Sequence, residues 1–386
     1  MLNRLIREKV TTYSELFPAV LIIGPRQCGK TTLVKETIEG QYFDLEKLSD
    51  YAYFDNDLEL AFKSIQGPII IDEAHLMPKL FSFLRSHIDE KRKKNGQIYL
   101  LGSVNPLLIK EISESLAGRI GIIDMTPLLL QEIESKSKPD THWFRGGFPD
   151  AFLAETDSHW SIWQENYIRT FVERDVGRHN LDLSSAQSHQ FLRMVAQYHG
   201  NILNASELGK AMGVSYHTIN RYLDILEACF IIRRLTPYYH NTLKRLVKSP
   251  KIYIRDSGLL HALHNIQNEQ DSFYSPKRGN SFEGYAIEQI IASSIVKNKK
   301  SEFFYYRTHA GLEVDLIEQR GINNHIGYEI KTASHASKKE ARGISQLIKD
   351  GIVQKGYIIC MTERPYPIND KITVTNLSTL LSPNYQ

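Results

Sequence analysis

The sequence is poor in cysteine and contains no long apolar run. Its 386 residues include three cysteines, Cys28, Cys229 and Cys360, which are far apart and show no metal-ligand spacing. This scarcity argues against a disulfide framework and favours reduced thiols in a cytosol. No apolar stretch approaches the roughly 20 residues of a membrane helix, and charges interrupt the N-terminus where a signal peptide needs an apolar core. We therefore expect a cytoplasmic protein that has no membrane partner.

A strong excess of charge is also missing. The formal net charge is +3, from 47 basic and 44 acidic residues, which by itself is too small to indicate nucleic-acid binding. The chain has only 14 prolines and shows no internal repeat or low-complexity tract, so we expect no long disordered segment. Its length allows about two to four domains, each with its own core.

The segment Gly24–Thr31 reads G-x-x-x-x-G-K-T and indicates a phosphate-binding loop. An apolar run, Ala19–Ile23, precedes it as a predicted strand, and a predicted helix, Thr31–Glu39, follows. This arrangement directs backbone N–H groups and a helix N-terminus toward a triphosphate. The residues expected to bind the nucleotide are Gly24, Pro25, Arg26, Gln27, Cys28, Gly29, Lys30, Thr31 and Thr32. Lys30 is expected to reach the β- and γ-phosphates of ATP or GTP, and Thr31 to ligate Mg²⁺.

A second apolar strand, Pro68–Ile71, ends in two carboxylates. Asp72 is expected to hold the Mg²⁺ shell, while Glu73 orients and deprotonates water. A third strand, Ile98–Leu101, ends near Ser103 and Asn105, either of which can sense the γ-phosphate, although an ordinary polar turn fits nearly as well.

Arg119 is a candidate for stabilising charge on the transferred phosphate, either in its own subunit or in a neighbouring one. A surface arginine fits the sequence almost equally. A homo-oligomer or a protein partner therefore stays open.

Strands and helices alternate through the first part of the chain, which predicts a parallel sheet covered by helices. The remaining strands expected there are Gln41–Asp44 and Ile120–Met125. The pattern breaks around Glu134–Asp140, and Trp143–Arg174 then reads as helical. Aromatic residues recur along this stretch at helical spacing and indicate a buried face. They are Trp160, Trp163, Tyr167 and Phe171.

The middle of the chain has helix-turn-helix spacing. A capped helix over Asn204–Met212 is followed by Gly213, and Ser215 caps a second helix that runs toward Glu227. Phe230–Leu235 and Lys251–Ile254 fit the strands of a wing. In a DNA-binding version, Tyr216, His217, Asn220 and Arg221 face the groove. The basic residues expected at phosphates are Arg233, Arg234, Lys244, Arg245, Lys248 and Lys251. A winged helix used only for protein packing is the alternative.

A third group of polar residues lies near the C-terminus. Asp315 falls on a predicted strand, and Glu329 and Lys331 share one face of the next strand. Glu283 lies near the start of a predicted helix, Ser281–Ala292. Such carboxylates can share a divalent cation while the lysine activates water or steadies a scissile phosphate. Surface salt bridges explain the Asp315, Glu329 and Lys331 pattern about equally well.

These motifs together resemble the bacterial and archaeal AAA-type P-loop ATPases that carry a C-terminal domain of unknown function. The shared segments are Gly24–Thr32, Ile71–His75, Ala117–Arg119, Gly146–Pro149, Arg174–Val176, Thr218–Ile219, Tyr222–Leu223, Leu226–Glu227, Lys248–Tyr253, Asp256–Leu259, Glu313–Asp315 and Glu329–Lys331. The C-terminal part of that family is similar to the PD-(D/E)xK nuclease fold, matched by Asp315, Glu329 and Lys331 with Glu283 as the helical acid. The resemblance implies ATP rather than GTP.

The expected fold class is α/β. It comprises a P-loop ATPase domain (1–135), a helical lid (136–185), a winged helix (186–265) and a restriction-endonuclease-like domain (266–386). One hypothesis is ATP hydrolysis coupled to DNA binding, with cleavage by Mg²⁺ or Mn²⁺ at Glu283, Asp315 and Glu329. The other is a nucleotide-controlled switch whose nuclease-like domain is an inactive docking platform.

Overall fold

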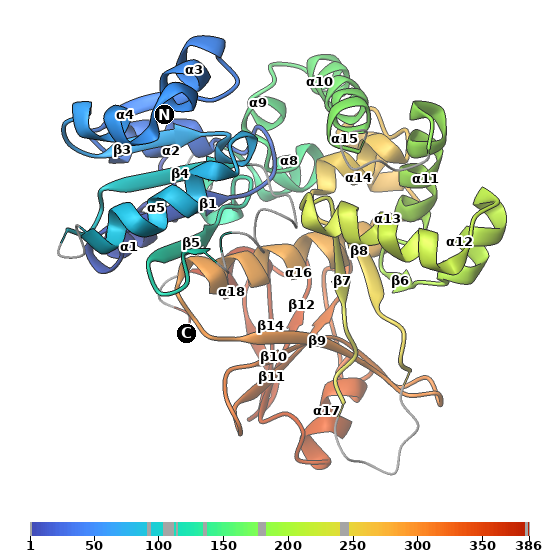
Figure 1. Ribbon diagram of the computed structural model, residues 1–386. Helices are drawn as coiled ribbons and strands as arrows, with labels where there is room; N and C mark the ends of the chain where they lie inside the picture. The colour runs from blue at the N-terminus through green and yellow to red at the C-terminus, as the bar shows by residue number, and fades with distance from the viewer. Residues whose placement is uncertain are drawn as a thin grey trace. The chain divides into compact units, whose positions relative to one another are not determined.

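Five short apolar segments near the N-terminus pair as parallel strands, in the order β2-β3-β4-β1-β5 (Figure 1). All five residues of β1 are buried, as expected for a central strand that is covered on both faces. The predicted strand bounds are met within a residue or two. The strands are β1 (Ala19–Ile23), β2 (Gln41–Asp44), β3 (Ile69–Asp72), β4 (Ile98–Gly102) and β5 (Ile120–Asp124).

The computed structural model describes residues 2–90, 94–102, 112, 115–133, 137–176, 183–239, 247–382 and 385. These residues form two compact units, Met1–Leu128 with Ala228–Phe230, and Leu129–Glu227 with Ile231–Gln386. The helices of the first unit are α1 (Arg7–Leu16), α2 (Lys30–Thr37), α3 (Leu48–Asn56), α4 (Leu58–Ser64), η1 (Ala74–Leu76) and α5 (Lys79–Glu90). The four domains proposed from the sequence stay a prediction.

The strand order determines where the first unit can build a site. β1 lies between β4 and β5, and β3 lies beyond β4, so the carboxyl ends of these parallel strands share one edge. Ligands of open α/β sheets bind at that edge. The loop after β1 and the carboxylates after β3 are therefore brought together by topology, although 40 or more residues separate them in the chain.

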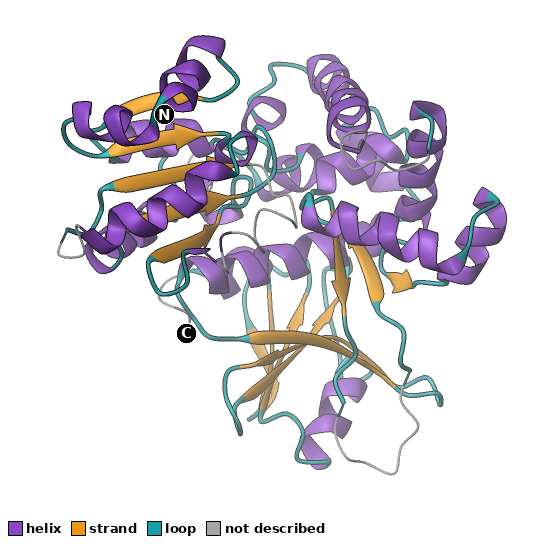
Figure 2. Ribbon diagram, in the orientation of Figure 1, coloured by secondary structure: helices purple, strands orange, loops and turns teal. Residues whose placement is uncertain are grey.

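The second unit begins with a helical region (Figure 2). The single helical stretch expected over 143–174 is wrong, because the chain breaks after Arg145 and again after Phe152. Trp160, Tyr167 and Phe171 are nevertheless buried, as their spacing predicts. The helices are α7 (Leu130–Ile133), α8 (Pro139–Arg145), α9 (Pro149–Phe152), α10 (Asp157–Thr170), the π-helix η2 (Phe171–Val176) and α11 (Ser185–Gln197).

The helices and turn of the predicted helix-turn-helix are present. Asn204 caps α12 (Ala205–Met212), Gly213 is left-handed with φ of 68°, and Ser215 accepts from the N–H of Thr218 ahead of α13 (Tyr216–Ala228). A three-stranded sheet follows in the order β6-β8-β7. Its strands are β6 (Asn201–Ile202), β7 (Ile232–Leu235) and β8 (Lys251–Ile254), and the next helices are α14 (Ser257–Leu263) and α15 (Glu269–Tyr274).

The C-terminal part is a six-stranded mixed sheet in the order β13-β14-β12-β11-β10-β9. A Cβ on Gly327 would contact Ile344 of helix α17, which therefore covers one face of the sheet. The neighbouring Tyr328 points to the other face of the sheet, which helix α16 covers. The elements are α16 (Arg278–Val296), α17 (Arg342–Lys349), α18 (Leu377–Leu381), β9 (Glu302–Arg307), β10 (Glu313–Gln319), β11 (His325–Ile330), β12 (Lys355–Ile359), β13 (Tyr366–Asn369) and β14 (Ile372–Thr375).

Among the residues that the structure describes, no helix combines the length and the apolar character needed to cross a membrane.

Candidate nucleotide site and C-terminal polar centre

The loop between β1 and α2 is shaped by residues in unusual backbone conformations. A Cβ on Gly24 would lie 2.3 Å from the carbonyl oxygen of Met125, so only glycine fits at this position. Gly29 has φ of 96° and Gln27 has φ of 58°, both in the left-handed region. These turns bring the chain back onto α2, which begins at Lys30. The predicted loop is therefore compact, with its N–H groups near a helix N-terminus.

The Lys30 side chain is buried within its own loop. Its Nζ donates to the carbonyl oxygen of Gly24 at 3.0 Å and to that of Pro25 at 2.8 Å. The ammonium therefore lies at the expected end of the loop. These carbonyl oxygens take two of the three ammonium donors, so one donor remains for a phosphate.

Arg4 also holds the loop, a contact that the sequence motifs do not reveal. Its Nη1 donates to the carbonyl oxygen of Cys28 at 2.9 Å, and its Nη2 donates to that of Thr126 at 2.7 Å. The guanidinium thus links the N-terminal segment, the phosphate loop and the segment after β5. Arg4 lies before α1 and outside every sequence motif, so no sequence signal pointed to this contact.

Asp72 accepts hydrogen bonds from three groups. Thr31 Oγ1 donates to Oδ2 at 2.6 Å, Tyr42 donates to the same oxygen at 2.8 Å, and the N–H of Glu73 donates to Oδ1 at 2.9 Å. The predicted pair of Thr31 and Asp72 is therefore in direct contact at the carboxyl edge of the sheet. Mg²⁺ prefers such oxygen ligands, so the pair fits a bound magnesium ion. Tyr42, the second residue of β2, was not predicted.

Glu73 is held in a strained backbone conformation. Its φ of 51° is in the left-handed region, where a residue with a Cβ costs roughly 1–3 kcal/mol. Its Oε2 lies 3.0 Å from His75 Nδ1. Burial alone raises the pKa of Glu73, but the contact with His75 and the charges of His75, Lys30 and Arg26 outweigh it and lower the pKa. The ionised form is the one that can accept a proton from water.

One of the remaining candidates of the first unit, Arg119, lies away from this edge. Ser103 and Asn105 lie outside the described residues, so their roles stay predictions. Arg119 precedes β5 and binds Asp89 in bidentate fashion, with Nε–Oδ1 2.7 Å and Nη2–Oδ2 2.9 Å. It therefore lies at the amino edge of the sheet, and five strand residues of about 3.3 Å each separate the two edges. Arg119 cannot reach a phosphate on its own loop. Its action in a neighbouring subunit stays a prediction.

The C-terminal candidates meet on β10 and β11. The register that pairs Leu316 with Tyr328 places Asp315 opposite Glu329. Lys331 Nζ lies 2.8 Å from Glu329 Oε1 and 3.8 Å from Asp315 Oδ2, while the N–H of Ile330 donates to Asp315 Oδ2 at 2.8 Å. Burial raises the pKa of Glu329, and repulsion from Asp315 raises it further. Burial likewise raises the pKa of Asp315, with a contribution from Glu283.

Lys251 sits beside these carboxylates and was misread from the sequence as a phosphate contact. Its side chain is buried, with Nζ 2.9 Å from Glu283 Oε1 and 2.6 Å from Glu313 Oε1. Tyr253 also donates to Glu283 Oε1, at 2.6 Å. Burial alone lowers the pKa of Lys251, but the carboxylates of Glu283, Asp315 and Glu313 outweigh it and raise the pKa. Lys251 and Tyr253 alternate on β8, so their spacing was a usable signal for a shared face.

This centre fits a divalent cation only in part. Oε2 of Glu329 is buried and accepts no hydrogen bond from any residue that the structure describes, which suits a metal ligand. Oε1 of Glu283, in contrast, is already occupied by Lys251 and Tyr253. No group of three or more His, Cys, Asp or Glu side chains among the described residues is arranged to hold a metal ion. Of the three carboxylates predicted to bind a metal ion, only Asp315 and Glu329 therefore remain as candidates.

Two distant shared segments meet in the second unit. Asp256 accepts from the N–H of Gly147 and from that of Leu259, each at 2.8 Å, and so caps α14. A Cβ on Gly146 would lie 2.3 Å from Asp256 Oδ1, which explains the glycine. Burial raises the pKa of Asp256 to about 6. Asp256–Leu259 is therefore the capped start of α14, and Asp256 ties it to the break after α8.

The basic residues near β7 are largely engaged in ion pairs. Arg233 binds Glu288, and Arg234 binds Asp224 and Glu227. Lys244 and Arg245 lie outside the described residues. At the start of α13, Tyr216, His217 and Arg221 are exposed. The surface predicted to face DNA is therefore available on α13, and Lys248 is exposed, whereas Arg233, Arg234 and Lys251 are engaged by carboxylates.

Comparison with protein families divides the chain into three matched segments. Residues 16–134 match an AAA domain, residues 136–270 match a domain of unknown function (DUF8612), and residues 278–380 match another (DUF4143). The first match coincides with the parallel sheet and the phosphate loop.

Curated relatives extend over nearly the whole chain. The uncharacterized protein Rv2008c of Mycobacterium tuberculosis is 35% identical over 369 residues, covering 95% of this chain and 81% of the relative. An uncharacterized protein of Haemophilus influenzae is 23% identical, covering 67% and 71%. Among solved structures, the Walker-type ATPase PABY2304 of Pyrococcus abyssi is 15% identical with a TM-score of 0.45, covering 68% of this chain and 96% of that one.

Proposed function

Because this chain belongs to the same family as Rv2008c and its residues 16–134 match an AAA domain, we propose that it hydrolyses ATP with Mg²⁺ and couples hydrolysis to DNA binding by the second unit. The observation that carries the first part is the set of hydrogen bonds to Asp72. They fix a carboxylate next to the Thr31 hydroxyl at the carboxyl edge of the sheet.

Each residue of this site has a distinct task. The phosphate loop orients the triphosphate, and Lys30 neutralises charge on its terminal groups. Thr31 and Asp72 hold Mg²⁺, which when bound offsets the negative charge of the phosphates. Glu73, ionised beside His75, accepts a proton from the attacking water. The strain in the Glu73 backbone fixes the carboxylate in place before the substrate binds.

The test measures ATP binding and phosphate release side by side. Lys30→Ala should abolish nucleotide binding, whereas Glu73→Gln should retain binding and lose turnover by about 10²-fold or more. Lys47→Ala, an exposed lysine of the same unit, serves as the control. Normal hydrolysis by Glu73→Gln would contradict the assignment of Glu73.

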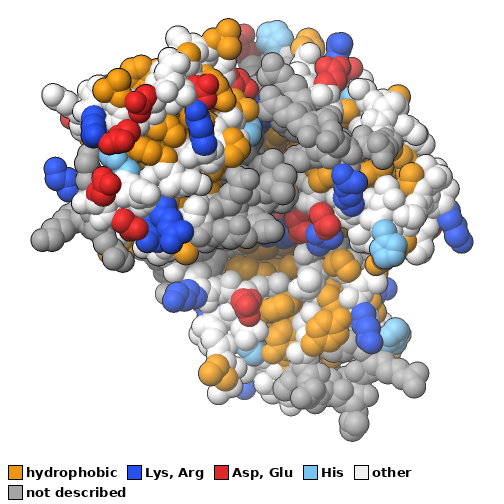
Figure 3. Space-filling view, viewed as in Figure 1, with side chains coloured by type: hydrophobic (Ala, Val, Ile, Leu, Met, Phe, Trp, Pro, Cys, Tyr) orange, Lys and Arg blue, Asp and Glu red, His pale blue; other side chains and the backbone are white. Residues whose placement is uncertain are grey.

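DNA is the proposed partner of the second unit because α13 exposes Tyr216, His217 and Arg221 after a helix-turn-helix. On the face drawn in Figure 3, basic and acidic side chains of the described residues are interspersed, so the contact is expected to be local. Fluorescence anisotropy with labelled duplex should show weaker binding for Tyr216→Ala and Arg221→Ala, and unchanged binding for the exposed control Lys338→Ala. Equal binding by all three variants would argue against α13.

A second candidate function is metal-dependent cleavage of DNA at Asp315, Glu329 and Lys331. The buried Glu329 oxygen without a hydrogen-bond donor among the described residues favours it. Cleavage of single-stranded, duplex and branched DNA should be followed with Mg²⁺ or Mn²⁺, with and without ATP. Loss of cleavage in Asp315→Asn would support a nuclease. Phosphate release without cleavage would favour a nucleotide-controlled switch with an inactive docking domain.

A further inference from the structure

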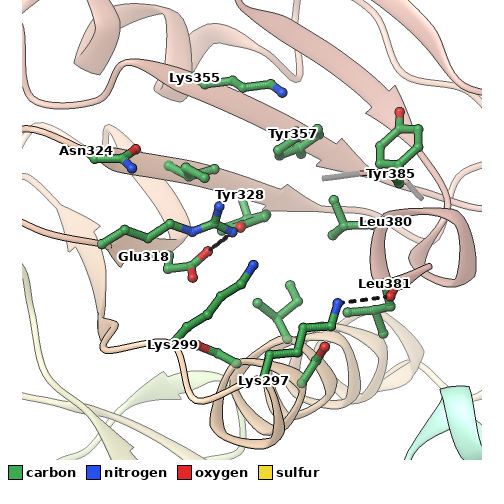
Figure 4. Close-up of a pocket in the computed structure, with 15 residues that line it drawn as sticks. Lys297, Lys299, Glu318, Asn324, Tyr328, Lys355, Tyr357, Leu380, Leu381 and Tyr385 are labelled. Carbon is green, nitrogen blue, oxygen red and sulfur yellow. Dashed lines mark hydrogen bonds and ion pairs between the residues drawn. The ribbon is translucent and has the colours of Figure 1, made fainter. Parts of the chain in front are cut away.

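The C-terminal sheet has a second polar site on the face opposite Glu329. A cavity of about 210 Å³ lies between α16, α18 and the strands β10, β11 and β12 (Figure 4). Tyr328 lines it, and because neighbouring strand residues point to opposite faces, Glu329 points away from it. A water molecule occupies about 30 Å³ in the liquid, so the cavity has room for a ligand of several heavy atoms.

The wall of this cavity is strongly basic. Four cationic side chains and one carboxylate line it, namely Lys297, Lys299, Arg320, Lys355 and Glu318. In Figure 4, Lys299 extends toward the strand that carries Tyr328, whereas Lys297 extends toward Leu381 and donates to its carbonyl oxygen at 3.5 Å. The lining therefore carries an excess of positive charge although the chain as a whole is close to neutral.

The single carboxylate does not balance these charges. Glu318 is 1% exposed and accepts from Arg320 Nη2 at 2.8 Å, from Tyr328 at 2.6 Å and from Ser301 Oγ at 2.9 Å. Its charge is offset by Arg320. Burial lowers the pKa of Lys297, and repulsion from Arg320 lowers it further. Lys299 is affected in the same way. A bound anion relieves this repulsion.

Hydroxyl groups in the wall point to the same ligand. Ser293 and Ser294 of α16 line the cavity and are 3% and 5% exposed, and neither Oγ has a hydrogen-bond partner among the residues that the structure describes. A buried hydroxyl without a partner costs about 1–3 kcal/mol. An oxygen-rich anion could accept hydrogen bonds from these hydroxyls and from the lysines together.

We propose that this cavity binds the phosphate groups of a small phosphorylated ligand, held by Lys297 and Lys299 and by the hydroxyls of Ser293 and Ser294. A phosphate offers several acceptor oxygens and more than one negative charge, which matches several donors and an excess of cations. The rings of Tyr328 and Tyr357 stack at 5.8 Å and form an aromatic wall beside it. The site is independent of the phosphate loop, because all its residues belong to the second unit.

The test is calorimetric titration of the full-length chain with sodium pyrophosphate. Lys30→Ala removes binding at the phosphate loop. In this background pyrophosphate should still bind to the proposed cavity. In that background, Lys297→Gln and Lys299→Gln should each weaken binding about tenfold, while Lys349→Gln, an exposed lysine on α17, should not. Loss of all binding with Lys30→Ala alone would overturn the proposal, as would indifference to Lys297→Gln and Lys299→Gln.

Serine variants keep the test independent of folding defects. Ser293→Ala and Ser294→Ala should weaken pyrophosphate binding while the melting temperature stays unchanged or rises, because each removes an unpaired buried hydroxyl. A lower melting temperature with unchanged affinity would instead indicate a structural role and would contradict the proposal. Titrations with inorganic phosphate and with AMP then show which class of small phosphorylated ligand the cavity binds. Binding confined to a 5′-phosphorylated oligonucleotide would overturn the assignment of a small ligand.

Discussion

At the scale of single residues, one carboxylate organises the nucleotide site. Asp72 accepts from the Thr31 hydroxyl in the first turn of α2, from the Tyr42 hydroxyl of β2, and from the N–H of the strained Glu73. Three separate segments are thus fixed by two oxygen atoms. Thr31 and Asp72 could be predicted because each belongs to a motif, whereas Tyr42 belongs to none.

The contribution of Tyr42 can be measured directly. Tyr42→Phe should lower the rate of ATP hydrolysis several-fold and reduce the free energy of unfolding by about 1 kcal/mol, because Asp72 loses one donor but keeps Thr31. Steady-state kinetics and urea unfolding provide the two values. Tyr53→Phe is the matched control, since its hydroxyl binds the exposed Ser64. An unchanged rate in Tyr42→Phe would show that Thr31 alone orients Asp72.

Lys251 has an equally central place in the second unit. Lys251→Met should reduce the free energy of unfolding by about 3–5 kcal/mol, because it leaves Glu283 and Glu313 without their shared cation. Lys248→Met, an exposed lysine just before β8, should change stability little. Urea unfolding distinguishes them. Similar stabilities for the two variants would mean that the carboxylates find other partners or take up protons at little cost.

At the scale of secondary-structure elements, a buried ion-pair network joins the three-stranded sheet to α16. Glu288 of α16 binds Arg233 of β7 and Arg255 just after β8. Burial alone raises the pKa of Glu288, but the two guanidinium groups outweigh it and lower the pKa to about 2. The network therefore stabilises the fold above the ordinary glutamate pKa of 4.5, and this stability is lost as the pH falls toward 2.

Glu288→Gln tests this network. At pH 7 the variant should lose about 3–5 kcal/mol of unfolding free energy, because two buried guanidinium groups lose their carboxylate. Between pH 4.5 and pH 2 its stability should fall less steeply than that of the parent chain. Urea unfolding across this pH range, with Glu165→Gln, an exposed glutamate of α10, as the control, measures both effects. Parallel pH profiles would rule out Glu288 as a source of acid sensitivity.

Elements with a strong local signal could be predicted from the sequence. β1 and β2 match the expected bounds because each is a short run between clear turn and helix signals. The continuous helix over 143–174 was wrong because the break after Arg145 depends on a distant contact, the approach of Gly146 to Asp256. The position of Arg119 at the opposite edge from the phosphate loop follows from β5 running parallel to β1, so the predicted strand Ile120–Met125 already implied it.

At the scale of the whole molecule, the chain consists of two compact units with different chemistry. The first contains the phosphate loop and the carboxylates of β3, and the second contains the Asp315 centre and the basic cavity beside α16. The buried ion pairs of Lys251 and the basic cavity were not predicted, because the residues of each come together only when distant strands and helices pack. Both are therefore features of tertiary structure.

Calorimetry can show whether the two units respond together to nucleotide. ATP with Mg²⁺ at about 100 times its dissociation constant should stabilise the first unit by about 2.7 kcal/mol and raise its unfolding temperature. Lys30→Ala should abolish this shift. A matching shift in the second unit would indicate energetic coupling between the units. An absence of any shift in the parent chain would contradict nucleotide binding at the loop.

The hydrogen bonds of Lys30 to Gly24 and Pro25 also have a kinetic consequence. They hold the ammonium at the loop before nucleotide arrives, while its third N–H stays available to a phosphate. Binding then needs no prior rearrangement of this side chain, so the observed rate of association by stopped flow should rise linearly with nucleotide concentration. A plateau at high concentration would instead reveal an opening step of the loop ahead of binding.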